Sequence, residues 1–535
     1  MKTIGVMLDC SRNAVKSVPA LKRFIDDSVK MNLNRLYLYM EDTYEIEGEP
    51  YFGHMRGRYT QKELAEIVNY GESKGIELVP CFQTLTHLNQ AFRWGKYNEI
   101  CDISDILLAD DERTYKLIDK MFSSLSKSFK CDNFNVGMDE AYFLGRGEYF
   151  RKNGCVSKID IFMKHLNRVN EIAHKYGKTI SIWSDMLYKA SLNSNVYYDT
   201  NVQFDEEFAK RIPKDITLIY WDYYHTDFDI YNKMTKNHKM IGNKIAFATG
   251  IWSWTGFAPS NTYGMKIVEP GIKSALANDI DDVIITAWGD NGGECLINSS
   301  LPSIFYASEL WRGETKLSVI KDHFYNVFGI KFDDFMKVDY VNLINKDNVH
   351  INPSKYLLFN DPFIGAMDYT LDGKENDKYS RIYRRIKYSS QKMKEYSYIT
   401  EFLADLAKCL SVKACLGLKT RDKYLKKDKD GLINLIPEYK RSIKLIKRFY
   451  SSYRKAWMTE NKSLGFEIQD YRIGGLILRL DNCINIIKQY YNGEIDKIDE
   501  LDQPILDFDC NKKDEISKQD TCFNSYMLSS SMNIF

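Results

Sequence analysis

Residues 133–145 read NFNVGMDEAYFLG, a short apolar alternation followed by two adjacent carboxylates, Asp139 and Glu140. The part up to Gly137 has the pattern of a β-strand, in which neighbouring side chains point to opposite faces. Adjacent carboxylates repel each other and are costly to remove from water. We therefore expect the pair just past the end of the strand, where both side chains can lean over one cavity.

Seven other runs resemble this strand, and several are almost continuously apolar, as is typical of parallel strands buried on both faces. Amphipathic segments such as residues 18–32, 114–129 and 159–178 have the spacing of helices. Eight β-α repeats in about 320 residues predict an α/β fold, a (β/α)8 TIM barrel. The predicted strands are Ile4–Leu8, Arg35–Met40, Ile76–Cys81, Asn133–Gly137, Thr179–Trp183, Thr217–Trp221, Lys244–Ile251 and Val283–Trp288.

An open, doubly wound sheet is the competing interpretation of the same repeats. Such a sheet concentrates its site at one switch point, whereas a barrel gathers residues from the C-terminal ends of all its strands. Polar and aromatic residues follow nearly all eight predicted strands, which favours the barrel.

The sequence changes character after about residue 320, where strand-like runs become rare. Residues 379–425 have the pattern of a long helix or a helix pair, and residues 435–462 and 470–493 predict further amphipathic helices. We therefore expect a catalytic barrel in residues 1–320 and an α-helical C-terminal domain in residues 321–535. The Ser-rich stretch 517–535 is expected to be frayed or loosely docked.

The bulk composition excludes several classes of function. The formal net charge of the 535 residues is +1, which gives no reason to expect a nucleic-acid partner or binding to an anionic membrane. The N-terminus lacks the apolar core of a secretory signal, and no apolar run is long enough to span a bilayer. Eleven dispersed cysteines without a CxxC pair indicate a reducing compartment, so we expect a cytoplasmic protein.

The predicted strand ends carry a ring of carboxylates, an arginine, a histidine and several indoles. Indole faces stack on the apolar faces of sugar rings, and carboxylates and arginine bind hydroxyl groups through charged hydrogen bonds. The ring therefore suits a carbohydrate, and no metal or nucleotide motif accompanies it. Its members are Asp9, Arg12, Glu41, Asp42, His87, Asp139, Glu140, Trp183, Asp185, Trp221, Asp222, Tyr223, Trp252, Trp254, Trp288 and Asp290.

The adjacency of Asp139 and Glu140 restricts the chemistry. Asp139 would oppose ionisation of Glu140 and keep it protonated, as a general acid toward a glycosidic oxygen requires. An ordinary retaining glycosidase also needs a second carboxylate across the sugar, about 5–5.5 Å away, and neighbouring residues suit that poorly. If the 2-acetamido group of the substrate is itself the nucleophile, Glu140 is the acid and Asp139 orients the acetamide N–H.

These residues resemble glycoside hydrolase family 20, the β-N-acetylhexosaminidases, over roughly residues 1–320. The segment VGMDE is similar to the family's H-x-G-x-D-E motif, and LDCSRNA to its first-strand motif. The resemblance implies that Asp139 orients the acetamide, that Glu140 is the acid/base and that Arg12 holds the sugar 3- and 4-hydroxyls.

Other segments extend the resemblance. It implies a supporting role for Asp42, a relay by His87 between such an Asp and the acid, and a contact of Asp290 with the 4- or 6-hydroxyl. The segments IWSDML, IYWDYY and TAWGDN are similar to those that form the aromatic wall of the family's sugar pocket.

Three features depart from the family pattern. Asn135 replaces the motif histidine, and the strand-seven segment IWSWTGF lacks the tyrosine that polarises the acetamide carbonyl, so Tyr223 is our substitute. Many members carry an N-terminal β-rich domain, whereas this sequence begins with the first barrel strand, so we expect a compact form.

The sequence thus predicts a retaining, exo-acting β-N-acetylhexosaminidase that removes terminal β-GlcNAc or β-GalNAc without a cofactor or metal. A homodimer is one expected assembly. Two alternatives stay open at this point. One is a two-carboxylate glycosidase that pairs Glu140 with Asp185 or Asp290, and the other is a barrel that binds sugar without turnover.

Overall fold

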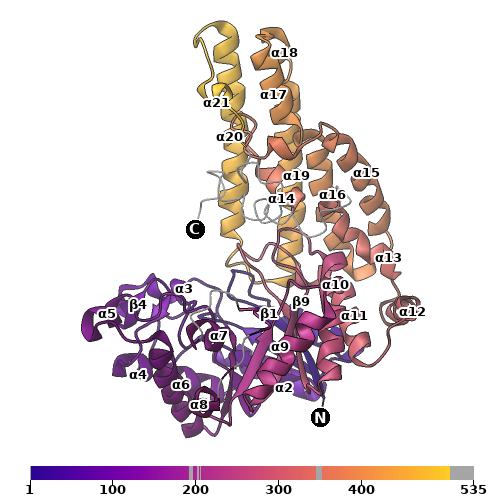
Figure 1. Ribbon diagram of the computed structural model, residues 1–535. Coiled ribbons are helices and arrows are strands. Elements are labelled where there is room, and N and C mark those ends of the chain that lie inside the picture. The colour runs from indigo at the N-terminus through magenta and orange to yellow at the C-terminus, as the bar shows by residue number, and fades with distance from the viewer. Residues whose placement is uncertain (1, 192–196, 202–203, 205, 345–351, 507–535) are drawn as a thin grey trace.

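The structure is a computed structural model that describes residues 2–191, 197–201, 204, 206–344 and 352–506. A barrel of parallel strands forms the lower part of the molecule in Figure 1, and helices form the upper part. Buried apolar side chains make one continuous core through both parts. The predicted order of an α/β barrel followed by a mainly helical region is confirmed.

The eight strands of the barrel pair in the order β1-β10-β9-β8-β7-β6-β3-β2. Because β1 pairs in parallel with both β2 and β10, the barrel is closed and the open doubly wound sheet is excluded. All eight predicted strands are present. Their bounds are β1 (Thr3–Asp9), β2 (Arg35–Tyr39), β3 (Glu77–Cys81), β6 (Asn133–Asn135), β7 (Thr179–Trp183), β8 (Thr217–Trp221), β9 (Lys244–Gly250) and β10 (Asp282–Ala287).

Strand β6 ends two residues earlier than predicted. The backbone is left-handed at Gly137 (φ 71°) and Met138 (φ 70°), which is incompatible with continued strand pairing. The Asn135 side chain accepts a hydrogen bond from the Gly137 N–H at 2.9 Å and supports this bend. The bend places Asp139 and Glu140 at the C-terminal face of the barrel.

The helices around the barrel form where the apolar spacing predicts them. Ser17 caps α1 (Val18–Lys30) by accepting the Ala20 N–H, and Leu21, Phe24 and Ile25 make its buried face. The other helices of this part are α2 (Gln61–Ser73), α3 (Asn89–Phe92), η1 (Gly95–Ile100), α4 (Glu112–Ser126), α5 (Glu148–Asn153), α6 (Lys158–Lys175), α7 (Asp185–Ser191), α8 (Glu206–Arg211), α9 (Phe228–Met240), α10 (Asn261–Ala277), η2 (Ile297–Ser300) and α11 (Leu301–Trp311).

A small hairpin lies between β3 and β6, made of β4 (Cys101–Ile103) and β5 (Ile106–Leu107). This hairpin was not predicted, since two or three residues are too few for a periodic signal. Asp102 in this hairpin accepts the N–H groups of Gly145 and Tyr149 at 2.8 and 2.7 Å. The hairpin therefore holds the chain that leaves the Asp139–Glu140 pair.

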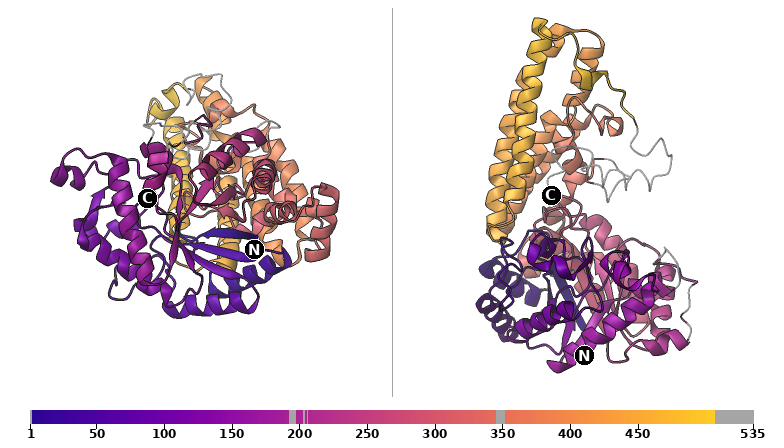
Figure 2. Two further views of the ribbon diagram at one scale, coloured as in Figure 1. Left: turned by 60° about the horizontal axis from the view of Figure 1, so that its bottom comes forward. Right: turned by 90° about the vertical axis from the view of Figure 1, so that its left-hand side faces the viewer.

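The helical region contains two long helices, α19 (Ile436–Glu460) and α20 (Glu467–Asn492), which run side by side away from the barrel (Figures 1 and 2). Both correspond to predicted helices. Residues 379–425 form three α-helices and a short 3₁₀ helix, not one or two helices, and residues 517–535 lie outside the described part. The remaining elements are α12 (Leu317–Phe328), α13 (Phe332–Phe335), η3 (Met336–Asn342), α14 (Pro353–Phe359), η4 (Asp368–Thr370), α15 (Glu375–Ser390), η5 (Lys394–Tyr396), α16 (Ser397–Lys413), α17 (Leu416–Leu425), α18 (Lys429–Ile433) and α21 (Asp499–Asp502).

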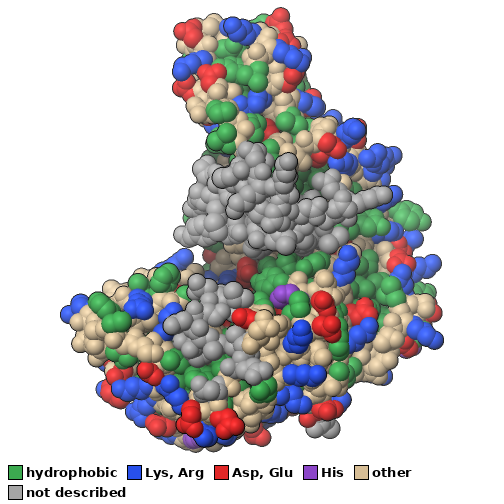
Figure 3. All heavy atoms as spheres, in the orientation of Figure 1, with side chains coloured by type: hydrophobic (Ala, Val, Ile, Leu, Met, Phe, Trp, Pro, Cys, Tyr) green, Lys and Arg blue, Asp and Glu red, His purple; other side chains and the backbone are tan. Residues whose placement is uncertain are grey.

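The predicted division between residues 320 and 321 falls within α12, and it stays a prediction. None of the helices in the described part of the chain combines the length and apolar character needed to cross a bilayer. On the face that Figure 3 shows, basic and acidic side chains are interspersed over the barrel and the tip of the helical region.

Phe134 on β6 tests the barrel core. Its ring is fully buried and contacts the rings of Phe82, Phe122 and Phe129 at centroid distances of 6.3, 6.0 and 6.4 Å. We expect Phe134→Ala to lower the free energy of unfolding by about 3–5 kcal/mol in chemical denaturation, because it removes apolar burial and leaves a cavity. Phe150→Ala, on a half-exposed ring, should change it by about 0.5 kcal/mol or less. A loss below about 1 kcal/mol at Phe134 would contradict this packing.

Candidate active site

The backbone turn after β6 depends on Gln83, which follows β3. Gly137 has a φ of 71°, which strains any other residue, and a Cβ atom there would lie 2.0 Å from Oε1 of Gln83 and displace that amide. The same oxygen accepts the Met138 N–H at 3.1 Å, and Nε2 of Gln83 donates to Oδ1 of Asp139 at 2.8 Å. One amide therefore fixes both the turn and the carboxylate that follows it.

Asp139 forms an ion pair with His87. Nε2 of His87 lies 3.3 Å from Oδ2 of Asp139, and Thr86 donates to the Asp139 carbonyl at 2.6 Å. Burial alone would lower the pKa of His87, but the attraction of Asp139 outweighs it and raises that pKa to about 10. Burial would likewise raise the pKa of Asp139, and the imidazolium and Gln83 lower it. Asp139 is thus an anion held beside a cation.

Glu140 occupies a different environment from its neighbour. Its side chain is 39% exposed, against 13% for Asp139, and its backbone N–H donates to Asp185 at 3.0 Å. The Tyr142 hydroxyl donates to Oε1 of Glu140 at 3.1 Å and accepts from Lys189 at 2.8 Å. Both carboxylates therefore lie near His87, with Oδ2 of Asp139 3.3 Å and Oε2 of Glu140 3.8 Å from its Nε2, and Glu140 is the more exposed of the two.

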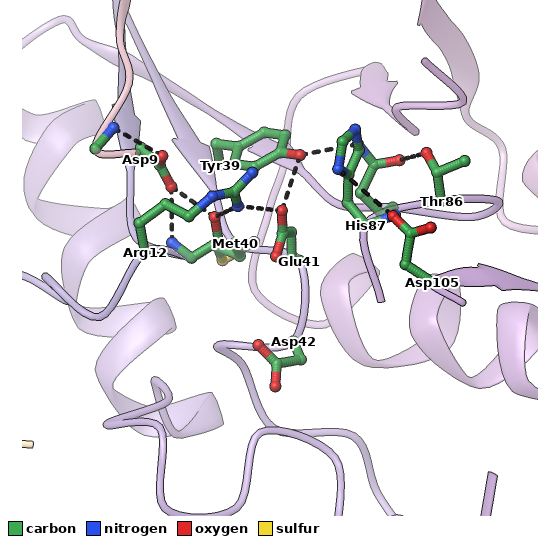
Figure 4. Close-up of polar contacts among 12 residues, drawn as sticks. Asp9, Arg12, Tyr39, Met40, Glu41, Asp42, Thr86, His87 and Asp105 are labelled. Carbon is green, nitrogen blue, oxygen red and sulfur yellow. Dashed lines mark hydrogen bonds and ion pairs between the residues drawn. The ribbon is translucent and has the colours of Figure 1, made fainter. Parts of the chain in front are cut away.

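The residue behind His87 is Asp105, not Asp42. Oδ2 of Asp105 lies 3.9 Å from Nδ1 of His87 and accepts its backbone N–H at 3.1 Å. Asp42 points away from this group in Figure 4 and pairs with Arg56 at 3.4 Å. The expected placement of Asp42 next to His87 is therefore wrong. The backbone is left-handed at Glu41 (φ 48°), so that Glu41 faces Arg12 and Asp42 faces Arg56.

Arg12 lies to the left of His87 in Figure 4, and both residues line the cavity. Its guanidinium donates to Glu41, which also accepts from the Tyr39 hydroxyl at 3.2 Å. Asp9 fixes the neighbouring loop by accepting the Gly289 N–H at 2.9 Å. These contacts hold Arg12 where it can bind an oxygen-rich ligand.

Asp290 is the second polar group at this side of the cavity. Burial raises the pKa of Asp290, Arg12 opposes that shift, and nearby carboxylates add to it, with a result of about 6. The side chain can therefore accept or donate hydrogen bonds near neutral pH, which suits a hydroxyl partner.

Aromatic rings complete the cavity, which is open to solvent. Tyr223 stacks on Trp221 at 5.2 Å, and Trp183 and Tyr39 contact Trp288 at 5.9 and 4.7 Å. Such a cavity suits one sugar ring with an apolar face. Its lining residues are Arg12, Tyr39, His87, Asp139, Glu140, Trp183, Trp221, Tyr223, Tyr224, Trp254, Trp288 and Asp290.

One cluster of three side chains at this site has ligand atoms of the kinds that bind metal ions. Ligand atoms of His87, Asp139 and Glu140 lie within 4.8 Å of one another. His87 and Asp139 form an ion pair within this cluster, with Nε2 and Oδ2 3.3 Å apart.

Sequence comparison assigns both parts of the chain. The profile of the glycosyl hydrolase family 20 catalytic domain matches residues 4–265, and that of the glycoside hydrolase 20C C-terminal domain matches residues 333–520. The chain belongs to glycoside hydrolase family 20. The predicted family membership is therefore confirmed, and the helical region corresponds to a named domain of this family.

The family 20 relatives are distant in sequence. Hexosaminidase D of Bos taurus is 23% identical over 259 residues, 47% of this chain and 70% of that protein. Beta-hexosaminidase 3 of Arabidopsis thaliana is 28% identical over 198 residues, which are 34% of this chain and 36% of that protein. The chain therefore spans only about a third of the length of that relative.

Solved family 20 structures are similar over part of the chain. The exo β-N-acetylglucosaminidase of Vibrio harveyi, in complex with N-acetylglucosamine, has a TM-score of 0.46 and 13% identity, covering 63% of this chain and 58% of that one. The β-N-acetylhexosaminidase of Bacteroides fragilis has a TM-score of 0.47 and 19% identity, covering 61% and 68%.

Three predicted binding residues of this family 20 chain lie behind the cavity instead of lining it. Asp185 is fully buried and accepts the Glu140 N–H and the Trp221 indole N–H. Asp222 is fully buried and accepts from the Tyr220 hydroxyl at 3.0 Å. Trp252 donates to the Tyr223 carbonyl at 2.7 Å. The prediction that these three residues contact the substrate is therefore wrong. They lie behind the residues that line the cavity and support them.

Five residues at the site were not predicted: Tyr39, Gln83, Asp105, Tyr142 and Tyr224. Tyr39 ends β2 and Gln83 lies two residues past β3, so an extended search of strand ends would have found both. Asp105 lies in the small hairpin region, and only the fold brings it to His87.

The position of Asp185 predicts a pH effect on stability. Burial, with the adjacent Asp139 and Glu140 charges, raises the pKa of Asp185 from 3.8 to about 7. The folded protein therefore keeps a proton that the unfolded chain loses between about pH 4 and pH 7, and the wild type loses stability as pH rises through this window. We expect Asp185→Asn, which cannot ionise, to gain up to about 4 kcal/mol relative to wild type between pH 4 and pH 8.

Thermal denaturation at several pH values measures this difference. Asp229→Asn, at an exposed position of α9, is the matched substitution control. A constant difference between Asp185→Asn and wild type across the window would contradict the assigned proton.

Proposed function

We propose that this chain is a retaining exo-β-N-acetylhexosaminidase that removes terminal β-linked GlcNAc or GalNAc. The observation that carries the proposal is the adjacent pair of carboxylates in the cavity, where Asp139 is the closer and more buried partner of His87 and Glu140 is 39% exposed. Family membership and a cavity lined by Arg12, Asp290 and aromatic rings support it. Of the two partners for a two-carboxylate reaction, Asp185 lies behind the cavity and Asp290 lines it, so the test below includes a glucoside.

The proposed reaction is substrate-assisted. Protonated Glu140 gives its proton to the glycosidic oxygen while the acetamide oxygen of the sugar attacks C1, so that the C1–oxygen bond to the leaving group breaks. Anionic Asp139 accepts the acetamide N–H and stabilises the positive charge of the oxazolinium intermediate. Glu140 then takes a proton from water as the water attacks C1 and opens the oxazolinium ring. This step restores the starting configuration at C1 and the protonated form of Glu140.

The remaining groups of the cavity bind the sugar in this proposal. Arg12 and Asp290 bind the ring hydroxyls, and Trp183, Trp221 and Trp288 surround its apolar face. Tyr223, which lines the cavity, grips the acetamide carbonyl. The indoles limit the cavity to a terminal residue, which favours exo action.

The cysteines bear on the proposed cytoplasmic location. The cysteines of the described part are free thiols, and most are buried. Free thiols persist in reducing compartments, so this observation supports that location. The homodimer stays a prediction.

The chemistry is tested with p-nitrophenyl β-glycosides of GlcNAc, GalNAc and glucose. We expect wild-type turnover of the two acetamido sugars only, and a fall in kcat of roughly 10²–10⁴-fold for Glu140→Gln, which removes the proton donor. Asp139→Asn should also reduce kcat, because the neutral amide no longer stabilises the cationic intermediate. Cleavage of the glucoside would instead indicate a two-carboxylate glycosidase. Binding of GlcNAc without any turnover would indicate a sugar-binding barrel.

The contact between Asp105 and His87 gives a second prediction. Asp105→Asn removes the carboxylate behind His87 and should lower kcat by roughly tenfold, as loss of an orienting partner does. Asp42→Asn, the matched change on the neighbouring acid that pairs with Arg56, should leave kcat within about twofold at temperatures where both variants are folded. A larger loss of kcat in Asp42→Asn than in Asp105→Asn would show that Asp42, not Asp105, acts through His87.

A further inference from the structure

The turn between α19 and α20 lies against the loop that follows β1 and carries Arg12. Ser17 N–H donates to the Glu460 carbonyl at 3.0 Å, and Lys462 N–H donates to the Val15 carbonyl at 2.7 Å. A Cβ atom on Gly465 would lie 2.2 Å from the Asn13 carbonyl oxygen. Backbone of the helical region is therefore in direct contact with a loop of the active-site face.

A buried ion pair fixes this contact. Nζ of Lys16 lies 2.6 Å from Glu460, and the two side chains are 3% and 2% exposed. The Tyr398 hydroxyl donates to the other oxygen of Glu460 at 2.8 Å. Charges this deeply buried are costly unless paired, so the loop after β1 is held where Lys16 meets its partner.

A second buried cluster joins the helical region to the loop that follows β10 and carries Asp290. Glu294 at the end of that loop lies 2.6 Å from Lys355 of α14 and 2.8 Å from Arg472 of α20, and all three side chains are 1–2% exposed. Arg472 also donates to the Asn291 carbonyl at 2.6 Å. Two cations on one carboxylate leave a surplus positive charge, and Lys355 also interacts with Asp290.

The two clusters serve neighbouring loops. Strands β1 and β10 are adjacent in the barrel, and their loops carry Arg12 and Asp290 on one side of the cavity. The groups assigned to the reaction, Asp139 and Glu140, follow β6 and are held by Gln83 and His87 of the barrel itself. The helical region therefore supports the hydroxyl-binding side of the cavity and leaves the reacting side to the barrel.

We propose that Arg472 and Glu460 are positioning residues that, through these buried clusters, set the places of Asp290 and Arg12 and so the enzyme's choice between sugars that differ at C4. This inference rests on the proposed function, because it concerns recognition of a terminal N-acetylhexosamine. Neither residue contacts the sugar. Each acts through a loop whose position depends on its buried charge.

The test compares Arg472→Met with Arg479→Met in the full chain. Arg479 lies two turns further along α20 and also forms a half-buried ion pair, with Asp361 at 2.6 Å, inside the helical region. We expect Arg472→Met to raise KM for the p-nitrophenyl GlcNAc substrate roughly tenfold to a hundredfold, as a misplacement of about 1 Å does. Its kcat should stay within about threefold. Arg479→Met should change neither parameter by more than about twofold.

Specificity distinguishes positioning from simple stabilisation. We expect Arg472→Met to shift the ratio of kcat/KM for the GlcNAc and GalNAc substrates. Arg472→Lys keeps a positive charge beside Glu294 and should partly restore the wild-type ratio. In an Asp290→Ala background the Arg472→Met effect on KM should disappear, because the group that it positions is absent. Full additivity of the two changes would overturn the proposal.

Other outcomes are equally decisive. Equal effects of Arg472→Met and Arg479→Met would show that Arg472 has a structural role only. If Arg472→Met does not fold, Arg472→Lys and Glu460→Gln carry the same test, and an unchanged KM and sugar ratio in both would overturn the inference. A wild type that cleaves no acetamido sugar would contradict the proposed function, whereas an active wild type with insensitive variants would contradict only the positioning role.

Discussion

The parallel pairing of β1 with β10 is the interaction on which the rest of the architecture depends. Six residue pairs, from Thr3 with Asp282 to Leu8 with Ala287, join the first and last strands and close the barrel. Closure brings the Arg12 and Asp290 loops together although about 280 residues separate them. It also creates the paired surface on which the α19–α20 turn lies.

Electrostatics then divide the site into two parts. On one side, Asp139 and His87 form a buried pair of opposite charges, and the adjacent Glu140, 3.8 Å from the same imidazole nitrogen, is the more exposed acid. On the other, Arg12 is matched by Glu41, and Asp290 lies near several charges of both signs. Burial acts to raise the pKa of both Asp139 and Asp290, but His87 and Gln83 outweigh it at Asp139, so these two carboxyls differ because their partners differ.

Periodicity and strand-end position predicted the eight strands and most of the cavity residues. Those signals are local, since each depends on a few neighbouring side chains. They failed where a loop conformation decides the outcome. Asp42 turns away to pair with Arg56, and Asp185 turns inward to accept the Glu140 N–H. Asp105 takes the place beside His87 that was expected for Asp42, and only the folded hairpin region brings it there.

The buried cluster of Glu294 and Arg472 also has a consequence for biosynthesis. Arg12, Asp290 and Arg472 leave the ribosome in that order, separated by 460 residues between the first and the last. At about 5–20 residues per second, translation of this interval takes roughly 20 to 90 s. The barrel can gather its reacting groups well before then, but the loops that are held by α20 take their final places only when that helix has been made.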